Sequence, residues 1–173
     1  MILWMRFILT IIRGILKGKN DVMASHTSTF RAYPLWDSEL TYMNAARYVS
    51  FCELNINEAN VRSGFFMSSF KHGFLGITCN MTTHYIKPVK IFKKFQVTTI
   101  VLGWDESFIY RKVQIHQGGK LRFEALYRIM VVVKSKKISP MDVIKMMGLN
   151  LTTSPPLPVE IELLNYRADK PHS

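Results

Sequence analysis

The sequence predicts an α+β domain in which one curved antiparallel sheet wraps a long central helix. Three features of the 173-residue chain lead to this prediction. A short strand precedes a long helix that is apolar on several sides, the pattern then changes from a helical to an alternating period, and at least four strands follow with short turns between them. The 48% hydrophobic content suits one globular domain with a real core.

The first residues, "MILWMRFILTIIRGILKGK", predict an amphipathic helix within residues 1–24. Arg6 and Arg13 interrupt the apolar run far short of the roughly 20 residues that a membrane-spanning helix needs. A helical projection separates a polar stripe from an apolar side. The stripe is Arg6, Thr10, Arg13 and Lys17, and the apolar side is Trp4, Phe7, Ile8, Ile11, Ile12 and Ile15.

Two interpretations of this helix stay open. It packs on its own domain or on a partner subunit, or residues 1–19 lie in an anionic membrane surface. The apolar run has no basic region ahead of it and no clear small-residue cleavage site, so it fits a secretory signal poorly. We therefore expect a cytoplasmic protein, located at the membrane periphery if the second interpretation holds.

The predicted first strand and central helix meet in the stretch "YPLWDSELTYMNAARY", residues 33–48. Phe30, Tyr33 and Trp36 suit a short strand. Asn44 is a good N-cap for a helix that runs to Gly64, a natural C-terminal stop. The first turns of this helix are apolar nearly all round, which is typical of a helix buried on several sides.

The alternating region begins after Gly64 and predicts neighbouring antiparallel strands in "GITCNMTTHYIKP", "KKFQVTTIVLGWD", "SFIYRKVQIHQ" and "KLRFEALYRIMVVVK". The two glycines of "QGGK" favour a tight hairpin. Ser139 and Pro140 start a short helix that ends at Gly148. The predicted domain therefore covers residues 25–148, and residues 149–173 form a tail that packs on the surface or stays mobile.

The formal charge of +11 favours acidic partners. Lys87, Lys90, Lys93 and Lys94 cluster at a turn between two strands, and Arg111 and Lys112 are expected nearby in the sheet. The cluster is either a solvated turn or a docking patch for CoA phosphates or an acidic carrier protein. We expect no nucleic acid partner, because no known nucleic-acid-binding motif is present. The histidines lack ligand spacing, so we expect no metal and no cofactor. Both cysteines are expected to be reduced packing residues.

This order of elements describes a hotdog fold, and two segments resemble the thioesterase-like hotdog family, including acyl-CoA thioesterases and the hydroxybenzoyl-CoA thioesterase superfamily. "YPLWDSELTYMNAARYVSFCELN" is similar to the family pattern DxDxxGHxNNxxYxxxxE, and "LGWDE" is similar to a turn between its middle strands. The resemblance covers roughly residues 30–148. It implies hydrolysis of an acyl-CoA or acyl-carrier-protein thioester by a homodimer or tetramer, with the thioester bound between subunits.

The resemblance also suggests catalytic residues. Thioester hydrolysis needs a carboxylate base or nucleophile and donors for the developing oxyanion. Asp37 is the leading candidate, although a carboxylate there also favours the start of the following helix. Asn44 caps the helix and would help to orient the base or the water, and the N–H groups of Ala45 and Ala46 are expected oxyanion donors.

Glu53 is a second catalytic candidate, because a charge on an otherwise apolar helix needs a partner or a function. The alternative is a salt bridge to Arg47 or Arg62. The expected substrate-binding residues are Trp36, Tyr42, Ala45, Tyr48, Lys87 and Lys90, with Trp36 and Tyr48 in the core or the tunnel wall.

Three departures from the family pattern leave the reaction open. Tyr42 replaces the family's His, Ala45 replaces its second Asn, and the acidic pair Asp37 and Glu39 is shifted by one residue. The alternative function is therefore a non-catalytic hotdog protein that binds acyl chains or a partner, at the membrane surface if the N-terminal helix lies there.

Overall fold

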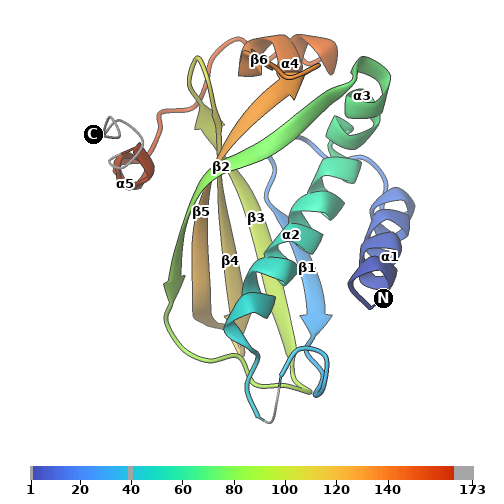
Figure 1. Cartoon of the computed structure of the whole chain (residues 1–173), viewed down its shortest axis with the longest axis vertical. Coiled ribbons are helices and arrows are strands. Elements are labelled where there is room, and N and C mark those ends of the chain that lie inside the picture. Colours follow the sequence, from blue (N-terminus) through green and yellow to red (C-terminus); the bar gives the residue numbers. More distant parts are fainter. Residues whose placement is uncertain (1, 39–40, 166–173) are drawn as a thin grey trace.

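The computed structural model describes residues 2–38 and 41–165 and forms a curved antiparallel sheet wrapped around one long helix (Figure 1). The sheet contains β1 (His26–Arg31), β2 (Phe74–Tyr85), β3 (Lys94–Trp104), β4 (Ile109–Gln117), β5 (Lys120–Val133) and β6 (Lys136–Ile138). The strand order is β1-β3-β4-β5-β2, and β6 pairs with β5 beyond the end of that path. The α+β hotdog prediction is thus confirmed.

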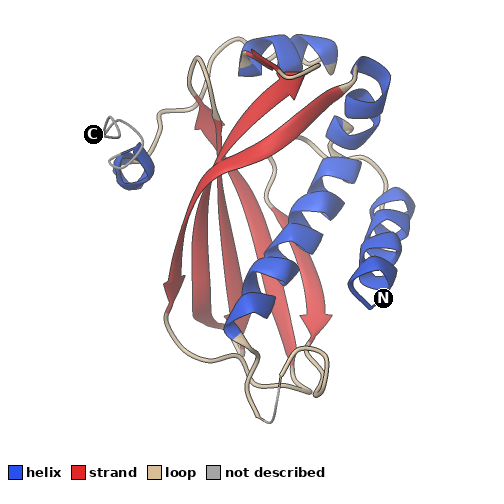
Figure 2. Ribbon diagram, in the orientation of Figure 1, coloured by secondary structure: helices blue, strands red, loops and turns tan. Residues whose placement is uncertain are grey.

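The central helix is α2 (Ala45–Arg62), which lies across the concave face of the sheet (Figure 2). Asn44 caps it as predicted, with its side chain accepting a hydrogen bond from the Ala46 N–H at 3.1 Å. The core lies between α2 and β3, β4 and β5. Its largest members are Tyr48, Phe51, Phe95, Ile115, Phe123 and Tyr127.

The described residues also form the helical segments α1 (Ile2–Leu16), α3 (Phe65–His72), α4 (Pro140–Met146), and a pair made of the 3-10 turn η1 (Val159–Ile161) and α5 (Glu162–Asn165). Ser139 caps α4 as predicted. The tail packs on the convex face, where Ile161 and Leu164 bury against Tyr110 and Leu126. Residues 166–173 of the tail, like Met1, lie outside the described residues.

The hairpin between β4 and β5 is built as expected, because Gly118 and Gly119 take φ angles of 62° and 71°. Two other expectations were wrong. The first strand ends at Arg31, so Tyr33 and Trp36 lie in the following loop. The segment after Gly64 begins with the helix α3 and not with a strand, since Gly64 and Gly73, both at positive φ, start and stop a single short helical run.

Helix α1 packs on its own domain, against α2 and beside β1 (Figure 1). The two helices approach closely at Gly14, where an added Cβ would lie 2.9 Å from Val61 Cγ1. The sequence left open which side of α1 faces the domain. The structure places the polar stripe inward, with Thr10 buried and Arg6, Arg13 and Lys17 directed at buried carboxylates.

Candidate active site

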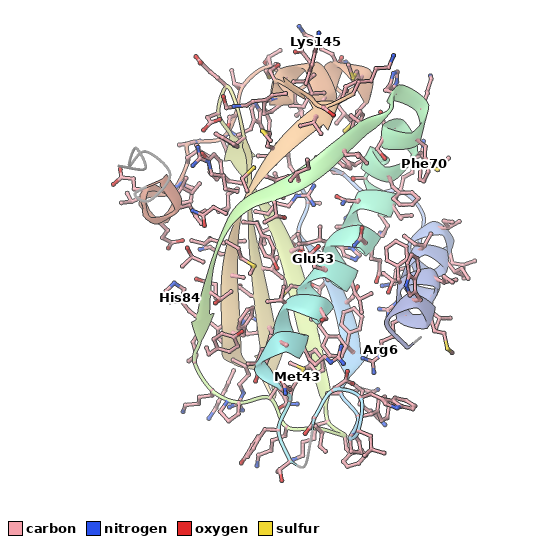
Figure 3. All side chains as sticks on the ribbon, viewed as in Figure 1. Arg6, Met43, Glu53, Phe70, His84 and Lys145 are labelled. Atoms are coloured by element: carbon pink, nitrogen blue, oxygen red, sulfur yellow. The ribbon has the colours of Figure 1, made fainter. Side chains whose placement is uncertain are left out.

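Asp37 is the most constrained of the expected catalytic residues. Its side chain is 1% exposed, and its two oxygens accept hydrogen bonds from the Arg6 guanidinium at 2.6 and 2.8 Å. One of the oxygens also accepts the Tyr33 N–H at 3.0 Å. Arg6 lies between α1 and α2 (Figure 3), over the ring of Phe51 at 5.1 Å. The carboxylate therefore ties α1 to the loop ahead of α2, a contact that the sequence analysis did not include.

Asn44 lies next to Asp37, because its N–H donates to the Asp37 carbonyl at 2.8 Å. Both residues border a shallow hollow of about 420 Å³, which Trp36, Ala46 and three other residues also line. Its remaining lining residues are Leu35, Ser38 and Arg47. The structure thus brings Asp37 and Asn44 together beside Trp36, which is half exposed and does not lie in the core as expected. The Ala46 N–H, an expected oxyanion donor, is already engaged by the Asn44 side chain. Glu39 lies outside the described residues.

Glu53 is separated from this hollow. It lies nine residues after Asn44 along α2, which corresponds to about 13 Å at 1.5 Å per residue. Its half-buried side chain, labelled in Figure 3, lines two cavities. The first, of about 500 Å³, lies beneath α3 and β2, and the second, of about 430 Å³, lies between α1 and α2. The structure therefore does not bring Glu53 together with Asp37 and Asn44.

The carboxylate of Glu53 is available to a ligand. Within the described part of the chain it accepts no hydrogen bond and forms no ion pair, so the expected salt bridge to Arg47 or Arg62 is not made. Burial raises the pKa of Glu53, and the positive charge of Arg111 partly opposes this shift. A carboxylate whose pKa is moved toward neutrality suits general base catalysis.

Arg111 is a functional candidate that the sequence analysis placed only near the lysine cluster and not beside Glu53. Its buried guanidinium lines the same 500 Å³ cavity as Glu53 and donates to Asn60 Oδ1 at 2.8 Å. Its Nε is buried and has no hydrogen-bond partner among the described residues. Burial lowers the pKa of Arg111 to about 10, against the effect of Glu53. The alternation of β4 could have indicated this position, because Arg111 shares the inward-facing side of the strand with Val113 and Ile115. A charged residue on an otherwise apolar, buried side needs a partner or a function.

The other expected substrate-binding residues lie elsewhere. Tyr48 is buried in the core, and its hydroxyl oxygen accepts the Val89 N–H at 2.8 Å. Ala45 is the first residue of α2, and its carbonyl accepts a hydrogen bond from the Tyr85 hydroxyl at 3.2 Å. Tyr42 is exposed and forms an isolated bridge with Lys90. Lys87 and Lys90 are exposed in the connection between β2 and β3, apart from the buried Arg111.

Residues 34–161 match a family model described as the thioesterase-like superfamily. A probable thioesterase of Saccharomyces cerevisiae is 28% identical over 113 residues. The match covers 62% of this chain and 49% of the yeast protein, so the chain spans about half the length of that relative.

Solved structures share the fold at low sequence identity. A probable thioesterase from Escherichia coli has a TM-score of 0.65 at 14% identity, covering 70% of this chain and 96% of its own. A hypothetical protein from Staphylococcus aureus in complex with CoA has a TM-score of 0.61 at 15% identity, and the match covers 80% of this chain and 94% of that protein. A mutant 4-hydroxybenzoyl-CoA thioesterase with bound 4-hydroxybenzoyl-CoA has a TM-score of 0.61 at 12% identity, and the match covers 71% of this chain and 98% of that protein.

Proposed function

The chain belongs to the thioesterase-like superfamily, and we propose that it hydrolyses an acyl thioester with Glu53 as general base. The observation that carries this proposal is the position of the Glu53 carboxylate. It is the half-buried acid that lines both cavities beside α2, its pKa is raised by burial, and Arg111 lines one of the same cavities.

The proposed reaction uses Glu53 and Arg111 in complementary roles. Glu53 removes a proton from a water molecule, whose oxygen attacks the thioester carbonyl carbon. The unpaired Nε–H of Arg111 donates to the oxyanion that develops on the carbonyl oxygen. Collapse of the tetrahedral intermediate breaks the carbon–sulfur bond, and the leaving thiolate takes the proton from Glu53. The products are a carboxylic acid and a free thiol.

Asp37 and Asn44 receive a different role in this proposal. Each Asp37 oxygen accepts a hydrogen bond from Arg6, so neither is presented to a water or a thioester while α1 is in place. We propose that Asp37 positions α1 and the loop before α2, and that Asn44 caps α2. Catalysis by Asp37 stays a prediction from the family resemblance, and it would require Arg6 to move away.

CoA and an acyl carrier protein both remain carriers to be tested. Lys87 and Lys90 are exposed at one end of the sheet and suit the phosphates of CoA or the acidic surface of a carrier protein. The CoA-containing complexes among the similar structures support the first choice. We propose CoA thioesters as the substrate class.

We also propose a homodimer that joins two sheets at β2, with further pairing to a tetramer left to measurement. Within the described residues, β2 pairs with β5 alone and is an edge strand. Leu75, Ile77 and Tyr85 on this strand are exposed large hydrophobic residues. A long apolar edge of this kind favours pairing with another strand.

A specific observation favours the alternative of a non-catalytic protein that binds acyl chains. Tyr42 and Ala45 replace the family's His and second Asn, and Asp37 is held by Arg6.

Cytoplasmic residence also stays a prediction, which cell fractionation tests.

The experiment that tests the proposed function measures release of free thiol from short, long and aromatic acyl-CoAs and from acyl carrier protein thioesters. Turnover of at least one CoA thioester is expected. If acyl-CoAs bind with saturation but no member of the panel is hydrolysed, the non-catalytic alternative replaces the proposal.

A further inference from the structure

Helix α1 is attached to the domain by its polar stripe, which reverses the usual orientation of an amphipathic helix. Arg6 binds Asp37, and Lys17 Nζ lies 2.7 Å from Glu58 Oε1. Arg13 Nε lies 3.7 Å from the same Glu58 oxygen. Both carboxylates are buried, so the cations of α1 are directed toward the domain. The apolar side of the helix is therefore turned outward.

The outer face of α1 consists of large apolar side chains that are between 47% and 80% exposed. Its members are Trp4, Met5, Ile8, Leu9, Ile12, Ile15 and Leu16. Isolated exposed hydrophobic residues are normal on a protein surface, whereas seven on one helix mark an interaction site.

A neighbouring loop extends this surface at the N-terminal end of α1, where the Arg6–Asp37 contact fixes its position. Leu35 in that loop is 91% exposed and has a φ of 65°. A leucine held in the left-handed region is uncommon and marks a conformation that the surrounding structure imposes. Trp36 follows it and is half exposed. An apolar residue and an aromatic residue thus project beside the helix.

We propose that the outer face of α1, together with Leu35 and Trp36, docks on the surface of an anionic phospholipid bilayer, with the helix lying parallel to it. The proposal does not depend on the reaction assigned to Glu53. The 15 residues of α1 span about 22 Å. No helix in the described ranges is long and apolar enough to cross a membrane. A helix that cannot span the bilayer but exposes an apolar face suits the interface between headgroups and acyl chains.

Charge favours an anionic lipid surface as the occupant. The chain carries a formal charge of +11, and α1 contains no acidic residue. Lys19 is exposed just beyond the C-terminal end of α1, and Arg47 lines the hollow with Leu35 and Trp36 at the other end. The nearest acidic residue along the chain after α1 is Asp21. Cations at both ends of an apolar face are attracted to anionic headgroups.

A second copy of the chain is a less suitable occupant. The proposed homodimer uses the β2 edge, which is at the opposite end of the sheet from β1. Helix α1 lies beside β1, since Arg13 Nη1 donates to the Thr29 carbonyl at 3.5 Å. The dimer partner at β2 would therefore leave the outer face of α1 uncovered.

The test is flotation of the full chain with phosphatidylcholine vesicles that contain or lack phosphatidylglycerol, over a range of lipid concentrations. The wild type is expected to float with the anionic vesicles, less so at high salt. Replacing Ile8 and Ile12 by Gln is expected to weaken binding by about tenfold or more, because the apolar area that enters the interface is lost. Both side chains are exposed, so circular dichroism should show the fold unchanged.

A control is Val159→Gln, which alters an even more exposed apolar side chain far from α1 in the chain and should bind as the wild type does. Failure of the wild type to float with anionic vesicles would overturn the proposal, as would equal binding by the Ile8→Gln/Ile12→Gln variant. Light scattering provides a third outcome. If the double substitution reduces the oligomeric state, the face joins copies of the chain and the membrane assignment is wrong.

Discussion

The Arg6 guanidinium of α1 holds both carboxylate oxygens of Asp37, 31 residues further along the chain, at 2.6 and 2.8 Å. This contact predicts a coupled effect on stability. Replacing Arg6 by Met should lower the free energy of unfolding by about 2–4 kcal/mol, because it leaves a buried carboxylate unpaired. The Arg6→Met/Asp37→Asn double variant should be less destabilised than the sum of the single variants. Urea denaturation measures all three.

Arg31→Met, at an exposed arginine, serves as the control for these variants and should change the free energy of unfolding by less than about 0.5 kcal/mol. An Arg6→Met protein as stable as the wild type would show that the ion pair does not anchor α1.

Glu58 predicts loss of stability in acid. Burial alone raises the pKa of this carboxyl, but hydrogen bonds with His26, Lys17 and Ser28 and the charge of Arg13 outweigh it and lower the pKa from 4.5 to about 2. A pKa lowered by folding stabilises the protein above the unfolded value, and this stabilisation is lost as the pH falls from about 4.5 toward 2.

Thermal unfolding between pH 7 and pH 2 tests the role of Glu58. Glu58→Gln should be less stable than the wild type at pH 7 and should lose less stability in the acid range. Glu106→Gln, at an exposed carboxylate in the turn between β3 and β4, should follow the wild-type curve. Parallel curves for wild type and Glu58→Gln would contradict the assignment.

The raised pKa of Glu53 predicts the pH dependence of turnover. A general base must be ionised, so kcat/KM should fall as the pH drops through the pKa of Glu53, which lies above the ordinary carboxyl range. Arg111→Gln removes the charge that opposes this shift, and should therefore move the acidic limb to higher pH as well as lower the rate. A limb that stays in place in Arg111→Gln would show that the two groups are not coupled.

The β2 edge predicts the oligomeric state. The wild type should be a dimer or a tetramer by light scattering, and Leu75→Lys/Ile77→Lys should dissociate it, because lysines on an edge strand oppose pairing. Val159→Lys is the control, as it places one lysine at an exposed apolar position away from β2. A monomeric wild type would remove the proposed interface.

Local signals predicted the elements that have a clear cap, turn or period. Asn44 and Ser139 predict the starts of two helices, the paired glycines predict the β4–β5 hairpin, and alternation predicts the strands. These features are predictable because each one depends on residues that are close together in the sequence. The helix α3 was missed because its 8 residues are too few for a clear period.

Long-range pairing decided the rest. The orientation of α1 depends on Asp37 and Glu58, which lie 31 and 41 residues from their partners Arg6 and Lys17. Sequence periodicity shows that a helix has two faces but not which face finds a buried carboxylate. Likewise, the sequence indicated both Asp37 and Glu53 as catalytic candidates. Only the folded structure shows that Asp37 is paired with Arg6 and that Glu53 lines a cavity.

Glu53 is distinguished from Asp37 as the general base by kcat on the best acyl-CoA for the isosteric variants Glu53→Gln and Asp37→Asn, each shown to be folded under the assay conditions. Glu53→Gln should lower kcat by about a hundredfold or more, as expected for loss of a general base. The kcat of folded Asp37→Asn should stay within about threefold of the wild-type value, since the altered contact positions α1. Near-normal turnover by Glu53→Gln, with loss of turnover in folded Asp37→Asn, would rule out Glu53 as the base and assign that role to Asp37.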